Sequence, residues 1–322
     1  MYTLTEAASR YFGRVYMLDL RRTSQGGLAA TASDGLLRIL DAQHLEQSTE
    51  WQTGHRKVTG LECLGQAVCT AGEDGMVCVW DVRAREAAVR FQVSKAPITA
   101  MCCSQTQIIA IGTELYKQEA SILLWDIRST PQPSTKYTQL HSDDITALST
   151  HANLPSALVS ASADGLVGLH DMRIVDEDEA TLLTHNLGAS VHRAGFLSSE
   201  MLFALSSDEL FALYPIGHGK TLEFGDLRKV LSCRYVADVL PKTDGSGAML
   251  GAGNQGNHAF NLIRLSRTSV TDWSFDPAAS VRLPGAHGAE VVRAYCFFDE
   301  HQLVFTAGED GNIRAWRPGG EH

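Results

Sequence analysis

Histidine, serine or threonine, and aspartate recur together along this chain, and these are the residue types that form a hydrolase triad. An enzyme needs its triad once, whereas a structural hydrogen-bond network can be needed in every repeat of a fold. The repetition therefore favours a structural role, and no set joins a nucleophile, a base and an oxyanion donor uniquely. We expect the protein not to be an enzyme and to have no catalytic residue. The three sets are His55, Thr70 and Asp74; His141, Ser160 and Asp164; and His287, Thr306 and Asp310.

Two of these sets extend to a tryptophan at a constant spacing. In both, four residues lead from the threonine to the aspartate, and six lead from the aspartate to Trp80 or Trp316. In the set with Asp164, His170 stands where the tryptophan is expected. The constant spacing predicts one repeated local structure, in which the polar side chains bond one another and hold a turn to its strands.

A glycine-rich segment offers a second chemistry, because Gly251–Gly256 fits the pattern G-x-G-x-x-G and Asp276 follows 20 residues later. In a dinucleotide-binding site this pattern is followed by a helix whose N-terminus faces the pyrophosphate. Residues 257–263 instead alternate polar and apolar types, as a strand does. The sequence therefore favours the turn of a degenerate repeat over a nucleotide site.

Cysteine and histidine usage argues against a metal centre. None of the seven cysteines forms a C-x-x-C pair, and the histidines outside the three sets are scattered, so we expect no metal and no cofactor. The odd cysteine number is typical of reduced thiols. Without an apolar run of about 18 residues or a leader-like start, we expect an intracellular protein, nuclear or cytoplasmic, that lacks a membrane segment.

The elements that must position the polar sets are short strands arranged in repeats. Asp41, Asp81, Asp126 and Asp171 each close an apolar run, and 40 or 45 residues separate one from the next. This is the length of a four-stranded propeller blade, and at about 45 residues per repeat the chain holds about seven. We predict an all-β fold in which residues 1–322 form a single domain, a seven-bladed β-propeller.

The last repeat lacks an outer strand of its own. The segment after Trp316 is short and rich in proline and glycine, whereas residues 2–6 are strand-like. We predict that the N-terminal strand completes blade seven, which would comprise about residues 285–318 plus 1–8 and would close the ring.

The sequence resembles the WD-repeat family, whose blades carry Gly-His before the innermost strand, Ser or Thr in the next strand, Asp in the turn and Trp before a closing Asp. Repeat two shows the whole pattern, and repeat seven shows it from His287 to Trp316. Repeat three keeps Trp125 but replaces the Asp-Gly turn by a longer loop, 114–120; repeat five has Tyr214 in the tryptophan position, and repeat six is the most divergent.

Within the family the chain looks closest to the subfamily of WD repeat-containing protein 89. Three segments carry this resemblance: His141–Thr146, the turn Ala163–Val167, and Gly112–Glu114 before the long loop of repeat three. The resemblance implies an intracellular interaction protein and supplies no activity. We expect a monomer that works inside a larger complex.

The family also implies that the loops with the histidines and the turns with the aspartates share one face of the ring. Acidic residues predominate in these segments, and the formal net charge of the chain is −10. Exposed carboxylates often do nothing beyond solvation, but an acidic face would attract a basic protein segment, such as a histone tail or a ribosomal-protein extension, and would disfavour direct nucleic-acid binding. The candidate partner-binding residues are Glu73, Glu114, Asp143, Asp144, Asp208, Glu209, Glu290 and Glu309. The acidic run 176–179 is expected to be a solvated loop on the opposite face.

An alternative function comes from arginines that follow the third strands. Trp80–Arg83 and Trp125–Arg128 have the form W-D-x-R, and Arg173 ends a weaker third copy. This form resembles substrate receptors of cullin-RING ubiquitin ligases, which dock on a triple-propeller adaptor. An arginine at this place can also simply pair with a neighbouring loop, so both interpretations stay open.

Overall fold

The computed structural model describes residues 1–84, 87–128, 132–242, 244–268 and 272–319. Strands make up most of this part of the chain. It forms two compact units, which we call the terminal unit (Met1–Gly54 with Leu227–His322) and the middle unit (His55–Asp226).

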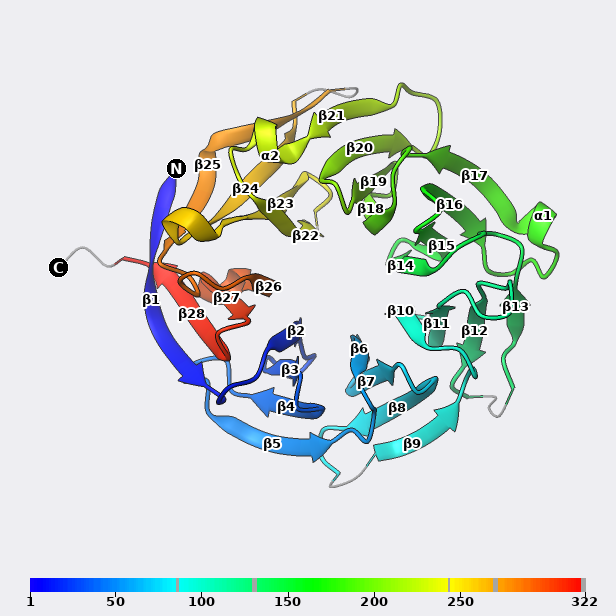
Figure 1. The fold of residues 1–322 in the computed structure, drawn as a ribbon, viewed down its shortest axis with the longest axis horizontal. Coiled ribbons are helices and arrows are strands. Elements are labelled where there is room, and N and C mark those ends of the chain that lie inside the picture. Colours follow the sequence, from blue (N-terminus) through cyan, green and yellow to red (C-terminus); the bar gives the residue numbers. More distant parts are fainter. Residues whose placement is uncertain (85–86, 129–131, 243, 269–271, 320–322) are drawn as a thin grey trace. The chain divides into compact units, whose positions relative to one another are not determined.

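Within the described residues, the middle unit contains four sheets of four consecutive strands each, and every neighbouring pair is antiparallel. We number them blade two (β6–β9), blade three (β10–β13), blade four (β14–β17) and blade five (β18–β21), as labelled in Figure 1. The strands are β6 (Val58–Leu64), β7 (Ala67–Gly72), β8 (Met76–Asp81), β9 (Ala87–Gln92), β10 (Ile98–Cys103), β11 (Ile108–Thr113), β12 (Ile122–Asp126), β13 (Thr135–Tyr137), β14 (Ile145–His151), β15 (Leu154–Ser162), β16 (Leu166–Asp171), β17 (Thr181–Asn186), β18 (Val191–Ser198), β19 (Met201–Ser206), β20 (Leu210–Pro215) and β21 (Leu222–Asp226).

Blade two illustrates why these residues form the strands of such a sheet. The second strand β7 is buried over almost its whole length, and its residues are small or β-branched, as expected for an interior strand. The outer strand β9 is mostly exposed, and apolar and polar residues alternate from Val89 to Gln92. Between β7 and β8, the Asp74-Gly75 turn requires a positive φ at Gly75, which is 73°.

Apolar clusters fill the spaces between consecutive sheets of the middle unit. Between blades two and three, for example, Cys69 and Val77 pack in one cluster with Ile111 and Trp125. Two similar clusters join blade three to blade four and blade four to blade five. Each core is therefore shared by two neighbouring repeats, so that a single repeat could not bury its faces alone.

The acidic run that was expected to be a solvated loop contains a single helical turn, α1 (Glu177–Ala180). The side chain of Asp176 caps it by accepting hydrogen bonds from the amides of Asp178 and Glu179. The run is mostly exposed to solvent, as expected, but it forms a helical turn where a loop was expected, because the aspartate at the N-cap satisfies amides that would otherwise lack partners.

The terminal unit contains one four-stranded sheet, blade one (β2–β5), and one eight-stranded sheet of order β22-β23-β24-β25-β1-β28-β27-β26. The eight strands form two sets of four, blade six (β22–β25) and blade seven (β26–β28 with β1). The elements are β1 (Tyr2–Tyr11), β2 (Met17–Arg22), β3 (Leu28–Ala32), β4 (Leu36–Leu40), β5 (Gln47–Gln52), α2 (Leu227–Val230), β22 (Tyr235–Pro241), β23 (Gly247–Asn254), η1 (Gln255–Asn257), β24 (Ala259–Arg267), β25 (Trp273–Pro284), β26 (Val292–Phe298), η2 (Asp299–His301), β27 (Leu303–Gly308) and β28 (Asn312–Pro318). The described strands thus group into seven sets of four, the number that the repeat length predicts.

The N-terminal strand completes blade seven, as predicted. β1 runs antiparallel to β28, from the pair Leu4–Pro318 to the pair Tyr11–Asn312, and so extends beyond residue 8. It also pairs in parallel with β25, through Tyr2 and Thr3, and this contact joins blades six and seven into one sheet (Figure 1). Chain segments more than 300 residues apart in sequence are therefore hydrogen-bonded in the terminal unit.

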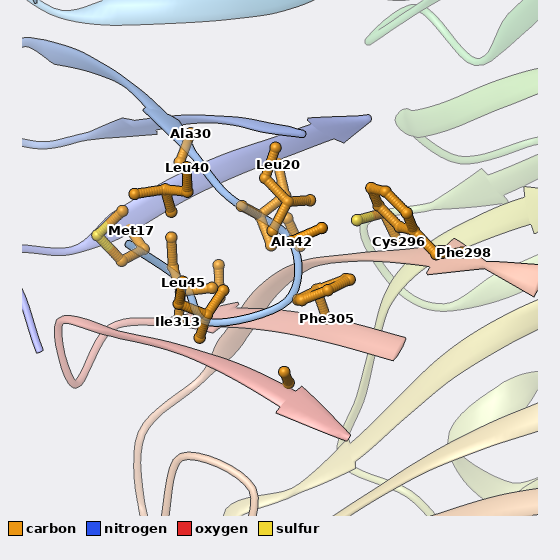
Figure 2. Packing of buried hydrophobic residues seen from close by; sticks show 14 of the residues in the cluster. Met17, Leu20, Ala30, Leu40, Ala42, Leu45, Cys296, Phe298, Phe305 and Ile313 are labelled. Atoms are coloured by element: carbon orange, nitrogen blue, oxygen red, sulfur yellow. The ribbon is translucent and has the colours of Figure 1, made fainter. Parts of the chain in front are cut away.

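The terminal unit has one apolar cluster between blades one and seven and a second between blades six and seven. Figure 2 shows Met17, Leu20 and Leu40 of blade one packed with Phe305 and Ile313 of blade seven. All five are buried, and the two aromatic rings of Phe298 and Phe305 meet edge to face, with centroids 5.1 Å apart.

Candidate functional site

The polar set of blade two forms a continuous chain of hydrogen bonds behind the Asp-Gly turn. His55 Nδ1 lies 3.0 Å from Asp74 Oδ1, and His55 Nε2 lies 3.0 Å from Thr70 Oγ1. Trp80 donates from Nε1 to the same threonine oxygen at 2.9 Å. Asp74 also accepts a hydrogen bond from the amide of Met76, so the chain ties the turn to both of its strands and to the preceding loop.

Blade seven repeats this arrangement. His287 bridges Asp310 at 2.7 Å and Thr306 at 2.8 Å, and Trp316 Nε1 donates to Thr306 at 2.9 Å. Burial alone would raise the pKa of Asp310, but the hydrogen bond and charge of His287 and the bonds from Asn312 outweigh it and hold the pKa well below its usual range.

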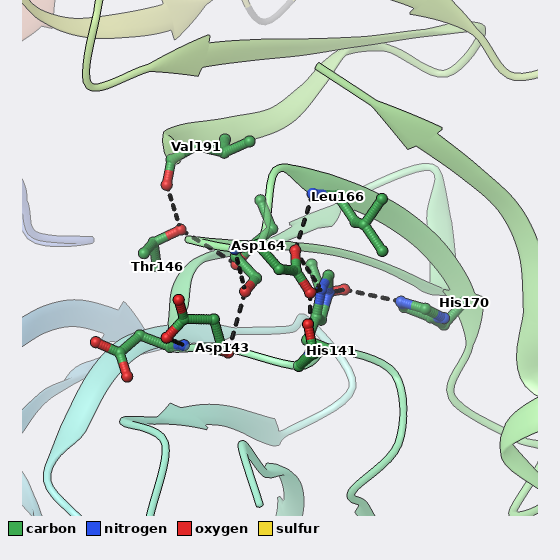
Figure 3. Close-up of polar contacts among 12 residues, drawn as sticks. His141, Asp143, Thr146, Asp164, Leu166, His170 and Val191 are labelled. Atoms are coloured by element: carbon green, nitrogen blue, oxygen red, sulfur yellow. Dashed lines mark hydrogen bonds and ion pairs between the residues drawn. The ribbon is translucent and has the colours of Figure 1, made fainter. Parts of the chain in front are cut away.

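Blade four keeps this series of hydrogen bonds, but its last member is a histidine and not a tryptophan, as Figure 3 shows. His141 lies 3.2 Å from Asp164 Oδ2 and 2.7 Å from Ser160 Oγ, and His170 Nε2 then lies 2.8 Å from the same serine oxygen. His170 therefore occupies the hydrogen-bonding position that tryptophan has in blades two and seven. Its other ring nitrogen lies 3.2 Å from Thr181 Oγ1, a contact that an indole could not make.

The histidine in the tryptophan position changes how protons can be placed in blade four. An indole N–H always donates, which leaves the hydroxyl proton of Thr70 available for His55. The single proton of Ser160 lies between two imidazole nitrogens, so it can be donated to only one of them, and the other must donate to the serine. Burial and the neighbouring His141 lower the pKa of His170 to about 4, which favours its neutral form.

In three other blades an apolar residue stands where blades two, four and seven have Ser or Thr. The strand registers place Ala30, Ile111 and Ala204 at this position in blades one, three and five. Trp125 of blade three consequently has no hydrogen-bond partner for its Nε1 within the described part of the chain. In blade five, Tyr214 takes the tryptophan position and stacks on His185 at 4.3 Å between ring centroids.

The glycine-rich segment of blade six is part of its sheet. Gly251 and Gly253 lie in β23, a single 3-10 turn (η1) follows, and β24 begins at Ala259, so a strand stands where a dinucleotide site needs a helix. The glycines make room for aromatic rings. A Cβ on Gly253 would lie 2.1 Å from the ring of Tyr235, and one on Gly251 would lie 2.4 Å from that of Tyr295.

Blade three closes its second hairpin with a loop that has its own small hairpin. Tyr116 and Glu119 pair across a tight turn in which Lys117 and Gln118 both have positive φ. The loop is held to its neighbours, since the amide of Glu114 donates to Pro97 O and the amide of Leu115 donates to Asp144 Oδ1 at 2.7 Å.

The predicted acidic residues differ in how much of their charge is already balanced. Glu73 accepts from both Arg56 and Lys57, which lowers its pKa, and Glu309 pairs with Arg293. Asp144 bonds the loop of blade three. The others that lie at the surface, wholly or in part, are Glu114, Asp143, Asp208 and Glu290.

Glu209 does not fit the expected acidic surface. Glu209 is buried, with 8% exposure. The prediction that it is one of the exposed partner-binding residues is therefore wrong. Glu209 follows Asp208 in the position that glycine has in the Asp-Gly turns, with a φ of 60°, and this tight turn encloses it.

The three arginines of the W-D-x-R segments have the same conformation. In each, Nε and Nη2 donate to the two carboxylate oxygens of the aspartate two residues earlier, at distances between 2.6 and 3.0 Å. The hydrogen bond of Arg83 lowers the pKa of Asp81 to about 2, and Arg128 does the same for Asp126. Arg173 pairs with Asp171 in this way in blade four. The guanidinium groups are nonetheless exposed to solvent.

Sequence reasoning missed a set of threonines that connect neighbouring blades. Thr99 of blade three donates to Ile145 O of blade four at 2.6 Å, and Thr146 of blade four donates to Val191 O of blade five at 2.6 Å (Figure 3). A β-branched apolar residue followed by threonine at the start of the innermost strand is the signal that could have indicated them.

Within the described residues, no group of three or more His, Cys, Asp or Glu side chains is placed to hold a metal ion. No helix in the same part of the chain is long and apolar enough to cross a membrane.

Comparison with known proteins agrees with the repeated geometry. The family model "WD domain, G-beta repeat" matches residues 47–81 and 278–317. A WD repeat-containing protein of Schizosaccharomyces pombe is 31% identical over 281 residues, which are 82% of this chain and 83% of that protein. The WD repeat-containing protein 89 homolog of Dictyostelium discoideum is 27% identical over 322 residues, covering 94% of this chain and 82% of that protein.

A solved structure supports the fold. A chain in the crystal structure of the Mitotic Checkpoint Complex superposes with a TM-score of 0.77 over 98% of this chain and 93% of that chain, at 16% identity. Identity this low speaks for the β-propeller fold alone. From the sequence relatives together with the repeated His–Thr–Asp–Trp networks, the chain belongs to the WD-repeat family.

Proposed function

We propose that the protein is a non-enzymatic protein–protein interaction scaffold or escort, and that the loops of its middle unit bind a basic protein segment. Support comes from the loop of blade three, where Leu115 and Tyr116 are 41% and 43% exposed although they are apolar. Glu114 precedes them directly, and Asp143 precedes the aspartate that holds the loop. Within the described ranges, neither Glu114 nor Asp143 forms an ion pair.

This combination suits a segment that is both basic and partly apolar. A few residues, often Trp, Tyr or Arg, carry most of the binding energy of an interface, while charges steer the encounter and set the register. The loop is held by Pro97 O and Asp144, so it loses little conformational freedom on binding. The net charge of −10 would accelerate the approach of a lysine- and arginine-rich segment.

Charge reversal tests the proposal. The double variant Glu114→Lys with Asp143→Lys should weaken binding of a histone-tail-like peptide about tenfold or more, measured by fluorescence anisotropy at low salt. The matched control is Asp178→Lys with Glu179→Lys, which changes the net charge equally but acts on the exposed residues of α1. If both double variants weaken binding equally, the overall charge of the protein explains the effect. If Glu114→Lys with Asp143→Lys does not weaken binding, the proposed site is refuted.

A second candidate function rests on the arginines of blades two, three and four. Three guanidinium groups are presented in one conformation by consecutive blades of the middle unit, each fixed by its aspartate. We propose as the alternative that they dock the triple-propeller adaptor of a cullin-RING ubiquitin ligase. Pre-fixed arginines lose little side-chain entropy when they bind.

Co-purification separates the two candidates. Arg83→Ala with Arg128→Ala should abolish recovery of the adaptor and leave binding of the basic peptide unchanged. Arg14→Ala with Lys220→Ala removes the same charge from other exposed positions and should leave both interactions intact. Full recovery of the adaptor with the first double variant would rule the alternative out.

A further inference from the structure

A cavity of 260 Å³ opens in blade three beside the loop 114–120. Its walls carry four hydroxyl groups, from Ser94, Thr113, Tyr116 and Ser121, and two ammonium groups, from Lys95 and Lys136. Three apolar residues line it as well: Val93, Ala96 and Leu123. All of these residues belong to the middle unit.

The position of the cavity follows from what blade three lacks. The strand registers make Thr70 of blade two equivalent to Ile111 of blade three. Two residues later, Gly72 of blade two is therefore equivalent to Thr113 of blade three. In blade two this place is covered by the imidazole of His55, since a Cβ on Gly72 would lie 2.7 Å from its ring. Blade three has neither that histidine nor the turn aspartate, and the space next to Thr113 stays open.

The polar groups of the wall are not all used within the protein. Thr113 Oγ1 accepts from the amide of Ser121, and Ser94 Oγ accepts from the amide of Ala96, but each hydroxyl still has its proton to donate. Lys136 pairs with Glu119 at 3.1 Å, whereas no ion pair involves Lys95 within the described residues. The lining therefore has two lysines against one glutamate, and the surplus positive charge is at Lys95.

We propose that this cavity binds an anionic side chain of a partner protein, a carboxylate or a phosphate. The apolar lining would contact the stem of such a side chain, and its oxygens would accept hydrogen bonds from the hydroxyls and from Lys95. Hydrogen bonds with a charged partner are roughly twice as strong as neutral ones, so the site discriminates against an uncharged isostere.

This site has the opposite charge preference from the acidic loop surface formed by Glu114 and Asp143. It does not depend on the basic-segment proposal, and either can fail without the other. A partner that used both would carry an acidic residue next to its basic ones.

Three small probes test the cavity directly: the N-acetyl amides of glutamate, phosphoserine and glutamine. Each is titrated into the full chain, and the amide signals of Ser94, Thr113 and Ser121 are followed by NMR. We expect glutamate or phosphoserine to shift these signals, and the one that binds more tightly identifies the anionic group. Glutamine has nearly the shape of glutamate without its charge and should have no effect.

A lysine variant provides the matched control. Lys95→Gln should weaken binding of the anionic probe about tenfold, the effect of losing one charge-assisted hydrogen bond. Lys220→Gln removes the same charge from an exposed loop of blade five and should change nothing. The proposal is overturned if glutamine shifts the three signals as much as glutamate, if none of the probes shifts them, or if the two lysine variants behave alike.

Discussion

Blades two and three are neighbours in the middle unit and use the same strand register, yet they close their second hairpins in opposite ways. Blade two uses a three-residue turn, 73–75, whose aspartate is bonded through His55 and Thr70 to Trp80. Blade three has Ile111 in the place of Thr70 and a seven-residue loop, 114–120.

The difference shows what the polar network does. Where the network is complete, as in blade two, its histidine, threonine, aspartate and tryptophan side chains are hydrogen-bonded to one another, and the turn is fixed to the sheet. In blade three, where it is missing, one buried indole N–H lacks a partner, a cavity opens, and the loop exposes Leu115 and Tyr116. The loop of blade three is therefore not held by the hydrogen bonds that fix the turn of blade two.

The largest effect is expected when blade two loses the hydroxyl of Thr70, which His55 and Trp80 share. Thr70→Val leaves Trp80 Nε1 and His55 Nε2 buried without their common partner and should lower the free energy of unfolding by about 3 kcal/mol. Urea denaturation measures this, with Ile111→Val at the same position of blade three as the control, for which about 1 kcal/mol is expected. Similar losses for both variants would show that the network adds no stability.

Blade four supplies a version of the network that responds to pH. Burial lowers the pKa of His170 from 6.5 to about 4, so as pH falls the unfolded chain takes up this proton before the folded chain does. The contribution to stability is therefore complete above about pH 6.5 and decreases as pH falls toward 4, by an amount on the order of 3 kcal/mol.

Denaturation across this pH range checks the effect. His170→Gln can still donate a hydrogen bond to Ser160 but does not titrate, so its stability should depend less on pH between 4 and 6.5 than that of the wild type. His44→Gln removes an exposed histidine and should keep the wild-type slope. If both variants retain the full slope, His170 is not its source.

The converse experiment gives blade three the hydroxyl that it lacks. Ile111 pairs with Leu123 and is the equivalent of Thr70 in blade two. Ile111→Thr therefore places a hydroxyl oxygen at this position, where it could accept a hydrogen bond from Trp125 Nε1. A buried hydroxyl normally destabilises relative to valine, but with a partner Ile111→Thr should be as stable as Ile111→Val to within about 1 kcal/mol. A downfield shift of the Trp125 indole proton would report the new bond, and its absence together with lower stability would contradict the register argument.

The smallest effect concerns the loop of blade three. Asp144→Ala removes the acceptor of the Leu115 amide, at an exposed site where a hydrogen bond contributes about 0.5 kcal/mol. Hydrogen exchange at Leu115 should become faster, while the melting temperature changes little. Asp143→Ala is the control and should leave this exchange rate as it was, so that equal acceleration by both variants would argue against a specific anchor.

The sequence predicted most accurately what is local to one hairpin. The spacing from Thr to Asp to Trp spans two antiparallel strands and their turn, so the register follows from the spacing, and the networks of blades two and seven could be named residue by residue. The N-terminal strand was also predictable, because the last repeat lacked a fourth strand and residues 2–6 were strand-like.

Prediction was weaker for the ion pairs and burial of individual charged side chains and for contacts between repeats. The sequence indicated an acidic surface, but Glu73 and Glu309 turn out to be balanced by basic neighbours and Glu209 is buried. The threonines that connect neighbouring blades and the anchor from Asp144 to Leu115 were not predicted, since both join different repeats.

By itself, therefore, the sequence determined the repeat, the all-β class and the residues of the complete networks, because periodic spacing fixes contacts within a hairpin. Only the tertiary structure decided which charges remain unbalanced, that His170 takes the place of an indole as hydrogen-bond partner, and that the missing histidine of blade three leaves a cavity. Those features depend on the distances between side chains in three dimensions, and the pattern of residue types along the chain does not encode these distances.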